Sequence, residues 1–232
     1  MILKKYDFLP QNMQNAEVKK YYDILKRKKF NLILKRIFDI IFSLILLVLL
    51  SPIFLILAIA IKIDSKGNVF FRQERITLYG KKFKIFKFRT MVQDADKNGN
   101  LVTQKKDTRI TKVGNLIRKS RLDEIPQLIN VLLGDMTFVG TRPEVEKYVN
   151  EYTNEMLATL LMPAGITSIA SIEYKDEDEI ISNATEAGKS IDEVYINEIL
   201  PEKMKYNLEY IKKFNCLKDI EICFKTITAV IK

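Results

Sequence analysis

Residues 40–61 read IIFSLILLVLLSPIFLILAIAI, the most apolar stretch of the chain, and no charged side chain interrupts it. Written as one helix, a stretch of this length can cross the ~30 Å hydrocarbon core of a bilayer. A helix in the core of a soluble protein would carry a polar stripe, and residues 40–61 show none. We therefore expect this stretch to insert into a membrane.

Ser51 and Pro52 lie at the centre of this stretch, where a proline removes a backbone hydrogen bond and kinks or breaks a helix. Both flanks are basic, so the positive-inside rule cannot orient a simple span. Two interpretations stay open: a kinked span, or a re-entrant hairpin that turns at Ser51 and Pro52. The hairpin agrees somewhat better with the flanks, because both would then face the anionic lipids of the cytoplasmic leaflet.

The composition narrows the chemistry that the chain can perform. Among 232 residues there is no histidine, which excludes Ser-His-Asp and Cys-His catalysis and histidine metal sites. The two cysteines, Cys216 and Cys223, are seven residues apart in a helical pattern, which predicts one shared helix face rather than a disulfide. The net charge of +9 favours an anionic partner: nucleic acid, anionic lipid or a phosphorylated substrate.

Residues 118–130, RKSRLDEIPQLIN, place two adjacent carboxylates, Asp123 and Glu124, just before Pro126. A proline fits the first turn of a helix, and the positions that repeat every three or four residues predict an apolar helix face: Leu122, Ile125, Ile129 and Leu132. A helix N-terminus favours negative charge, and Arg118 and Arg121 act in the same direction, so we expect both carboxylates to be ionised at neutral pH. They are either an acidic helix cap, or a nucleophile and metal ligands for phosphate chemistry.

Apolar and cationic residues alternate over residues 83–89, FKIFKFR, which predicts a strand after a turn at Tyr79 and Gly80. Its lysines either bind phosphates or lipid headgroups or form a solvated face, and Arg89 at its end is the better site candidate. Near the N-terminus, Tyr21, Tyr22 and neighbouring apolar residues predict a short amphipathic helix on a surface, with a frayed tail as the alternative.

The order of these motifs resembles that of the bacterial sugar transferases, the monotopic polyprenyl-phosphate phosphoglycosyl transferases, from about Leu34 to the C-terminus. The segments that carry the resemblance are residues 35–39 (KRIFD), Ser51 with Pro52, 71–75 (FRQER), 87–91 (KFRTM), 107–109 (DTR), 114–118 (GNLIR), 122–132 (LDEIPQLINVL) and 134–143 (GDMTFVGTRP). Each motif alone is modest, and the set in this order is highly specific.

The resemblance implies a polyprenyl-phosphate sugar-1-phosphate transferase, a phosphotransferase. In such enzymes the aspartate that matches Asp123 attacks the β-phosphate of a UDP-sugar, UMP leaves, and polyprenyl (undecaprenyl) phosphate then takes the sugar phosphate from the aspartate. Glu124 is the partner of Asp123, and Mg²⁺ bridges the Asp123 carboxylate and the diphosphate. The implied phosphate-binding residues are Arg72, Arg75, Lys87, Arg89, Arg118 and Arg142.

The resemblance also implies a re-entrant membrane helix that is broken at Ser51 and Pro52, with Lys35, Arg36 and Asp39 at its start. The expected fold is α/β (α+β), with a small globular domain and amphipathic helices at the interface. The expected division is an N-terminal extension (1–33), the membrane helix (34–62) and a catalytic domain (63–232), at the cytoplasmic face of the bacterial inner membrane. The implied partners are a UDP-sugar, polyprenyl phosphate and membrane lipid, not nucleic acid; a homodimer is compatible with the sequence.

Two departures from the family pattern concern loops. Thr141 stands where the family has the first proline of Pro-Arg-Pro, and residues 165–175 (GITSIASIEYK) replace a loop that usually ends in arginine, with Lys175 at that position. The second loop is a plausible place for sugar or nucleotide selection, so the sugar stays open. The sequence also permits a catalytically silent, membrane-anchored scaffold of the same fold. A third function, a basic nucleic-acid binder, is disfavoured by the apolar run.

Overall fold

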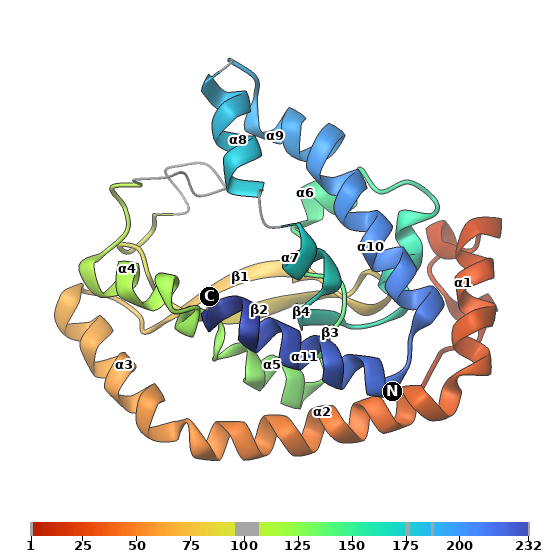
Figure 1. Ribbon diagram of the computed structural model, residues 1–232, viewed down its shortest axis with the longest axis horizontal. Helices are drawn as coiled ribbons and strands as arrows, with labels where there is room; N and C mark the ends of the chain where they lie inside the picture. Colours follow the sequence, from red (N-terminus) through yellow and green to blue (C-terminus); the bar gives the residue numbers. More distant parts are fainter. Residues whose placement is uncertain (1, 96–106, 175–176, 187, 232) are drawn as a thin grey trace.

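The computed structural model describes residues 2–95, 107–174, 177–186 and 188–231, and it mixes helices with two small sheets (Figure 1). Strand β1 (Phe70–Ile76) pairs with β2 (Lys82–Phe88) in antiparallel register, and β3 (Met136–Val139) pairs with β4 (Ala164–Thr167) in parallel. The predicted strand and its preceding turn are therefore confirmed, since η3 (Leu78–Gly80) connects β1 to β2 and Tyr79 adopts a left-handed φ of 57°. The mixed helix and sheet content agrees with the expected fold class.

The apolar run forms parts of two helices, α2 (Lys29–Leu49) and α3 (Ser51–Asp64), which follow one side of the molecule as an arc (Figure 1). They are bent by 61° at their junction. Pro52 occupies the first turn of α3, where its missing N–H breaks no hydrogen bond. Among the described residues no single helix is long and apolar enough to span a membrane, and this bent pair qualifies only when its two helices are taken together.

The first half of α2 does carry a polar stripe, which begins before the apolar run. Lys35, Asp39 and Ser43 lie four residues apart and are buried. Lys35 donates to the carbonyl of Val139 at 2.8 Å and pairs with Asp219, and Asp39 accepts a hydrogen bond from β3. The start of α2 is therefore fastened to the globular part of the chain, whereas most apolar side chains from Leu44 onward are exposed.

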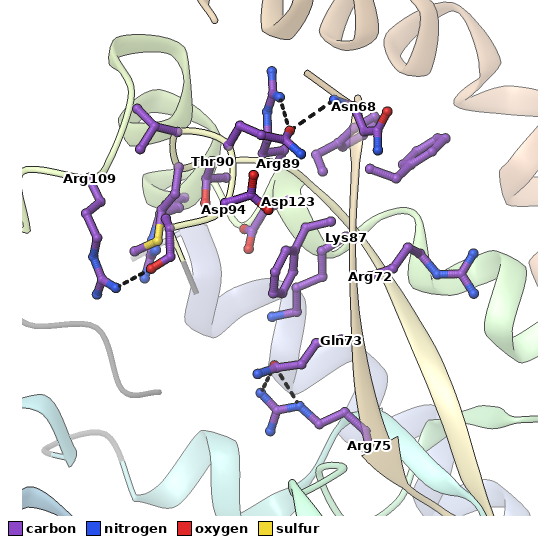
Figure 2. A pocket seen from close by; sticks show the side chains of 18 residues that line it. Asn68, Arg72, Gln73, Arg75, Lys87, Arg89, Thr90, Asp94, Arg109 and Asp123 are labelled. Atoms are coloured by element: carbon purple, nitrogen blue, oxygen red, sulfur yellow. Dashed lines mark hydrogen bonds between the residues drawn. The ribbon is translucent and has the colours of Figure 1, made fainter. Parts of the chain in front are cut away.

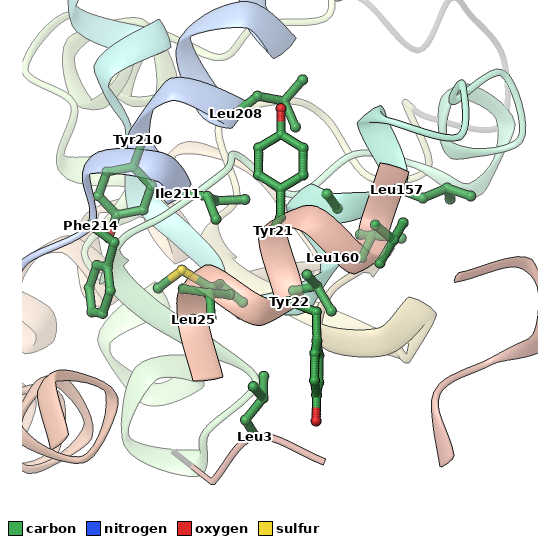
Figure 3. Packing of buried hydrophobic residues seen from close by; sticks show 14 of the residues in the cluster. Leu3, Tyr21, Tyr22, Leu25, Leu157, Leu160, Leu208, Tyr210, Ile211 and Phe214 are labelled. Carbon is green, nitrogen blue, oxygen red and sulfur yellow. The ribbon is translucent and has the colours of Figure 1, made fainter. Parts of the chain in front are cut away.

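The N-terminal helix α1 (Ala16–Arg27) packs into the main core, which differs from the predicted surface helix or frayed tail. Tyr21, Tyr22 and Leu25 are all buried, and Figure 3 shows them among side chains of η5 (Met156–Leu161) and α10 (Leu200–Lys213). Helical spacing predicts an apolar face correctly, but it contains no information about the partner that covers this face. The N-terminal residues thus belong to the globular core.

The remaining elements surround the two sheets. They are η1 (Tyr6–Phe8), η2 (Gln11–Met13), α4 (Lys112–Lys119), η4 (Leu122–Glu124), α5 (Gln127–Leu133), α6 (Glu146–Val149), α7 (Ile169–Glu173), α8 (Glu177–Glu186), α9 (Ile191–Val194), the π-helical turn η6 (Tyr195–Ile199) and α11 (Cys216–Ile231). Both cysteines lie on α11 as free thiols, as predicted. Gly134 ends α5 with a φ of 91°, the left-handed conformation that favours glycine at this position.

Candidate active site

A pocket of about 370 Å³ opens beside β1 and β2 (Figure 2). Its lining includes Asp123 and five of the six predicted phosphate-binding residues, which are Arg72, Arg75, Lys87, Arg89 and Arg118. These residues come from β1, from β2 and the residue after it, from α4 and from η4. The structure therefore brings together side chains that are up to 51 positions apart in the sequence (Arg72 to Asp123).

The strand register explains which β1 side chains share a face with Lys87. Phe71 lies opposite Lys87, and because side chains alternate along a strand, Gln73 and Arg75 face the same side. Arg72 belongs to the other face, where its guanidinium carbon lies 3.4 Å from the ring centroid of Phe86. Figure 2 accordingly shows Arg72 pointing away from Lys87. Arg75 is thus better placed than Arg72 to meet a ligand beside Lys87.

Asp123 and Glu124 lie in the short turn η4, which precedes α5 and is separate from it. Arg121 enters this turn with a left-handed φ of 56°, and Pro126 is the N-cap of α5 rather than its first residue. The N-cap residue makes no side-chain capping hydrogen bond. The carboxylates are therefore next to the helix start, as predicted, but α5 does not include them.

The predicted apolar face of this helix is only half-buried, and the fully buried positions are others. Leu128 and Val131 are buried together with the polar Gln127 and Asn130. The reason is that α5 packs against β2 and β3 on one side and α2 on another, so it has no single solvent face for the spacing to reveal. Arg36 on α2 adds to this contact, since its guanidinium donates to the carbonyl of Val131 at 2.6 Å.

Glu124 joins two cations from different parts of the chain. Its Oε1 accepts from Lys87 Nζ at 2.8 Å and from Arg142 Nη2 at 2.8 Å. Burial alone would raise the pKa of Glu124, but the charges of Arg142 and Lys87 outweigh it and hold the pKa well below its ordinary value. Glu124 in turn raises the pKa of Arg142. Glu124 is thus a fixed anion between two cations.

Asp123 has a different environment, although it is the neighbour of Glu124 in the sequence. It is half-buried and lines the pocket. Burial raises its pKa, the charge of Lys87 opposes this shift and the charge of Glu124 adds to it. The lowered pKa of Glu124 agrees with the expectation that this carboxylate is ionised at neutral pH. For Asp123 burial, rather than the helix end or the arginines, is the largest effect on the pKa, and its ionisation at neutral pH stays a prediction. Burial also lowers the pKa of Lys87, against the effect of Glu124.

Asn130 positions the carboxylates and was missed as a site residue by sequence reasoning. Its Oδ1 accepts from the backbone N–H of Phe86 at 2.8 Å, and its Nδ2 donates to the carbonyl of Lys84 at 3.1 Å. These two bonds fasten α5 to β2 and so fix the turn that carries Glu124 beside Lys87. An asparagine flanked by apolar residues in the middle of the helix was the available signal, because buried polar groups are usually hydrogen-bonded.

Four predicted phosphate-binding arginines donate hydrogen bonds within the protein: Arg72, Arg75, Arg89 and Arg142. The buried Arg89 donates to the carbonyls of Ser65 and Lys66, both at 2.7 Å, and so holds the C-terminal end of α3. Arg142 does not line the pocket and reaches the site through Glu124. Sequence reasoning also missed Gln73, whose Oε1 accepts from Arg75 Nη2 at 2.6 Å. Phosphate binding by these arginines stays a prediction.

The loop expected to select the sugar lies elsewhere. Its described residues, 165–174, form the rest of β4 and α7, and none of these lines the pocket. Lys175 lies outside the described residues. The role of this loop in selection also stays a prediction.

No group of three or more histidine, cysteine, aspartate or glutamate residues that could hold a metal ion occurs in the described part of the chain. Magnesium, however, is commonly bound by one or two carboxylates together with substrate phosphates and water. Asp123 supplies one such carboxylate in a pocket whose lining also includes the carboxylate of Asp94 and cations suited to phosphate. The donor set therefore fits a magnesium ion that arrives with a phosphorylated substrate.

Comparisons with known proteins found similar sequences. The family model described as bacterial sugar transferase matches residues 30–232. A UDP-N-acetylgalactosamine-undecaprenyl-phosphate N-acetylgalactosaminephosphotransferase of Aeromonas hydrophila is 36% identical over 76% of this chain and 38% of its own length. A UDP-glucose:undecaprenyl-phosphate glucose-1-phosphate transferase of Escherichia coli K12 is 36% identical over 74% of this chain and 34% of its own length. The chain thus spans little more than a third of the length of these relatives.

Proposed function

Because the chain belongs to the bacterial sugar transferase family, we propose that it moves a sugar-1-phosphate from a UDP-sugar to undecaprenyl phosphate and releases UMP. Such a transfer would begin the assembly of a polysaccharide or glycoconjugate. The names of the relatives support the two substrates. The observation that carries the proposal is the Asp123–Glu124 pair beside Lys87, at a pocket lined by arginines.

In the first step, a carboxylate oxygen of Asp123 attacks the β-phosphorus of the UDP-sugar. An oxygen–phosphorus bond forms, the bond from this phosphorus to the bridging oxygen breaks, and UMP leaves with the electron pair. In the second step, a phosphate oxygen of undecaprenyl phosphate attacks the same phosphorus, and the Asp123 carboxylate is released. Covalent catalysis of this kind divides one transfer into two phosphoryl transfers.

The other side chains have distinct roles in this proposal. Arg75 and Arg118 line the pocket and would bind the diphosphate oxygens. Glu124 holds Lys87 at 2.8 Å, so the ammonium group is fixed before substrate enters, and preorganised charge of this kind stabilises the transition state. Partial burial leaves the Asp123 carboxylate less solvated than a surface aspartate, which favours attack. Magnesium held by Asp123 would neutralise phosphate charge.

We further propose that α2 and α3 form a re-entrant membrane helix, with the globular part on the cytoplasmic face of the bacterial inner membrane. The support is the 61° bend between them, the exposed apolar side chains from Leu44 to Ile63 and the basic flanks. Arg89, which lines the pocket, also binds the end of α3. The pocket would therefore lie at headgroup level, where the phosphate of a membrane-bound polyprenol is found.

The expected organisation follows from this arrangement, with 34–62 as the membrane element and 63–232 as the catalytic domain. Residues 1–33 add α1 to the core of that domain.

The test of the reaction uses the detergent-purified full chain, undecaprenyl phosphate, magnesium and a panel of UDP-sugars, with UMP release as the readout. At least one sugar should give UMP, and omission of magnesium should stop the reaction. Asp123→Asn should abolish turnover, and Asp7→Asn, at an exposed aspartate, is the matched control. Intact-mass analysis without the polyprenyl acceptor should show a phosphosugar on the wild-type chain and none on Asp123→Asn.

Full activity in Asp123→Asn would refute the nucleophile. No UMP and no adduct with any UDP-sugar would favour the scaffold function instead.

The hairpin is tested by labelling single cysteines at its two ends. In a chain whose native cysteines are replaced by serine, Lys29→Cys and Lys66→Cys introduce thiols at exposed positions. A membrane-impermeant reagent should label both thiols in inside-out vesicles and neither in intact spheroplasts. Labelling of one end from each side of the membrane would show a span.

A further inference from the structure

Glu144 is a buried carboxylate that the proposed reaction does not use. It lies two positions after Arg142, keeps only 6% of its surface exposed and does not line the pocket. Its side-chain Oε1 accepts a hydrogen bond from the hydroxyl of Tyr195 at 2.7 Å. A buried charge is costly unless it is paired and hydrogen-bonded, so a compensating cation is expected nearby.

Two arginines lie near Glu144: Arg142 lines the same small cavity as Glu144, and Arg75 donates to the carbonyl of the preceding residue, Pro143. Burial lowers the pKa of Arg75, the charge of Glu144 raises it, and the charge of Arg142 lowers it. Glu144 also adds to the raised pKa of Arg142, behind the larger effect of Glu124. The charge of Glu144 thus favours the charged form of both guanidinium groups, whereas the charge of Arg142 disfavours that of Arg75. Glu124 contacts only Arg142 of this pair, through the hydrogen bond described above.

The backbone around Glu144 touches the same strand that carries Arg75. The carbonyl of Pro143 accepts from Arg75 Nη1 at 3.2 Å, and the carbonyl of Glu144 accepts from the N–H of Ile76 at 2.9 Å. Residues 142–144 thus link Arg142 directly to the end of β1. A shift of the backbone at residues 143 and 144 would therefore move both Arg75 and Arg142.

Tyr195 reaches Glu144 from a π-helical turn, η6, between α9 and α10. Turns of this type are rare and occur often at functional sites. The Tyr195 ring is buried against Tyr148, with ring centroids 4.4 Å apart, and Lys203 Nζ lies 3.4 Å from the Tyr195 hydroxyl. Lys203 is itself paired with Glu177 at 3.0 Å. Burial raises the pKa of Tyr195, so the phenol stays a hydrogen-bond donor to Glu144 at physiological pH.

We infer that Glu144, held by Tyr195, is a positioning residue for the diphosphate of the substrate: it keeps Arg75 and Arg142 together at the site against their mutual repulsion. This inference rests on the proposed function for its substrate. It assigns no contact between Glu144 and substrate, and it requires that the loss of the Glu144 charge act through the two arginines.

The experiment compares Glu144→Gln, Tyr195→Phe and Tyr148→Phe in the detergent-purified full chain. Glu144→Gln keeps an acceptor for Tyr195 but removes the charge, and Tyr195→Phe removes only the donor. Tyr148→Phe is the matched control, because it removes a hydroxyl from the same cluster that binds Asp192 instead. The readouts are the Kd for UDP, the kcat and KM for UMP release, and the thermal unfolding midpoint.

We expect Glu144→Gln to weaken UDP binding about tenfold and to lower kcat more than it raises KM, since misplaced cations lose transition-state stabilisation. Tyr195→Phe should act in the same direction with a smaller effect, and Tyr148→Phe should leave both parameters unchanged. In an Arg75→Ala/Arg142→Ala background, Glu144→Gln should have no further effect on UDP binding, because residues that act as one unit are not additive.

The two proposals fail in different ways. If the wild type releases no UMP but Glu144→Gln still weakens UDP binding, the transferase proposal fails and the positioning role stands. If Glu144→Gln lowers only the unfolding midpoint, with the Kd, kcat and KM of the wild type, Glu144 is merely structural and the inference is overturned. An equal loss of binding in Tyr148→Phe, or in the Arg75→Ala/Arg142→Ala background, would also overturn it.

Discussion

One carboxylate oxygen of Glu124 accepts hydrogen bonds from both Lys87 and Arg142, so loss of the Glu124 charge should destabilise the fold. In Glu124→Gln the side-chain oxygen can still accept hydrogen bonds, but Lys87 and Arg142 lose the anion between them. The Glu124 side chain is 14% exposed and the Lys87 side chain 21%, so water replaces this charge only in part. Removing one partner of a fully buried ion pair costs about 3–5 kcal/mol.

The Arg142 side chain is 36% exposed, so screening by solvent reduces this cost. We expect Glu124→Gln to lower the free energy of unfolding by about 2–3 kcal/mol at pH 7. For a chain of this size that corresponds to a decrease in Tm of roughly 4–12 °C. The matched control is Glu146→Gln, which removes the anion from a pair with Lys82 whose side chains are 54% and 48% exposed, and it should change Tm little.

The pH dependence of this stability difference tests whether the charge of Glu124 is its cause. The pKa of Glu124 is held below its ordinary value in the folded chain, so its contribution is complete above the unfolded pKa and is lost as the pH falls. The difference between wild type and Glu124→Gln should therefore shrink below about pH 4.3, by about 1.4 kcal/mol per pH unit. Circular dichroism at 222 nm during heating measures both chains in detergent. A Tm no lower than that of Glu146→Gln, or a difference that persists unchanged at pH 3, would refute the reasoning.

Two further substitutions test the supports of the site by the same thermal unfolding assay. Asn130→Ala should lower the free energy of unfolding by about 2–4 kcal/mol, because it leaves an N–H and a carbonyl of β2 without their partners. The control Asn115→Ala, at an exposed position, should lower it little. Equal effects of the two substitutions would contradict the role assigned to Asn130. Gly67→Ala should destabilise the protein more than Gly80→Ala. Both glycines have a positive φ, but only at Gly67 would a Cβ lie 2.1 Å from the guanidinium of Arg89. A larger effect of Gly80→Ala would show that this crowding is relieved.

Local patterns predicted several parts of the site from the sequence. Alternation along 83–89 predicted the strand that carries Lys87, and the apolar run with Pro52 predicted a helix that breaks at Ser51. Each of these properties depends on neighbours within a few residues, through side-chain periodicity or the missing N–H of proline. The adjacency of Asp123 and Glu124 made them candidates together, but it could not separate their environments.

Contacts with distant segments of the chain make the environments of Asp123 and Glu124 different. Glu124 meets Lys87 and Arg142 because Asn130 fixes α5 on β2 and because residues 134–143 return along β3, and neither contact is encoded by spacing. Asp123, one residue earlier, is half-buried in the pocket instead, which raises its pKa rather than lowering it. Electrostatic shifts depend on burial and on charges within a few ångströms, so they follow the packing of distant segments.

The sequence by itself therefore determined the broken apolar helix, the basic strand and the motif order of the family. Only the tertiary structure decided which of these elements pack together and which of their side chains contact one another. It placed α1 in the core rather than on a surface and used Arg89 to hold the end of α3. The physical reason is that backbone preferences act over a few residues, whereas burial and charge pairing depend on which distant surfaces meet.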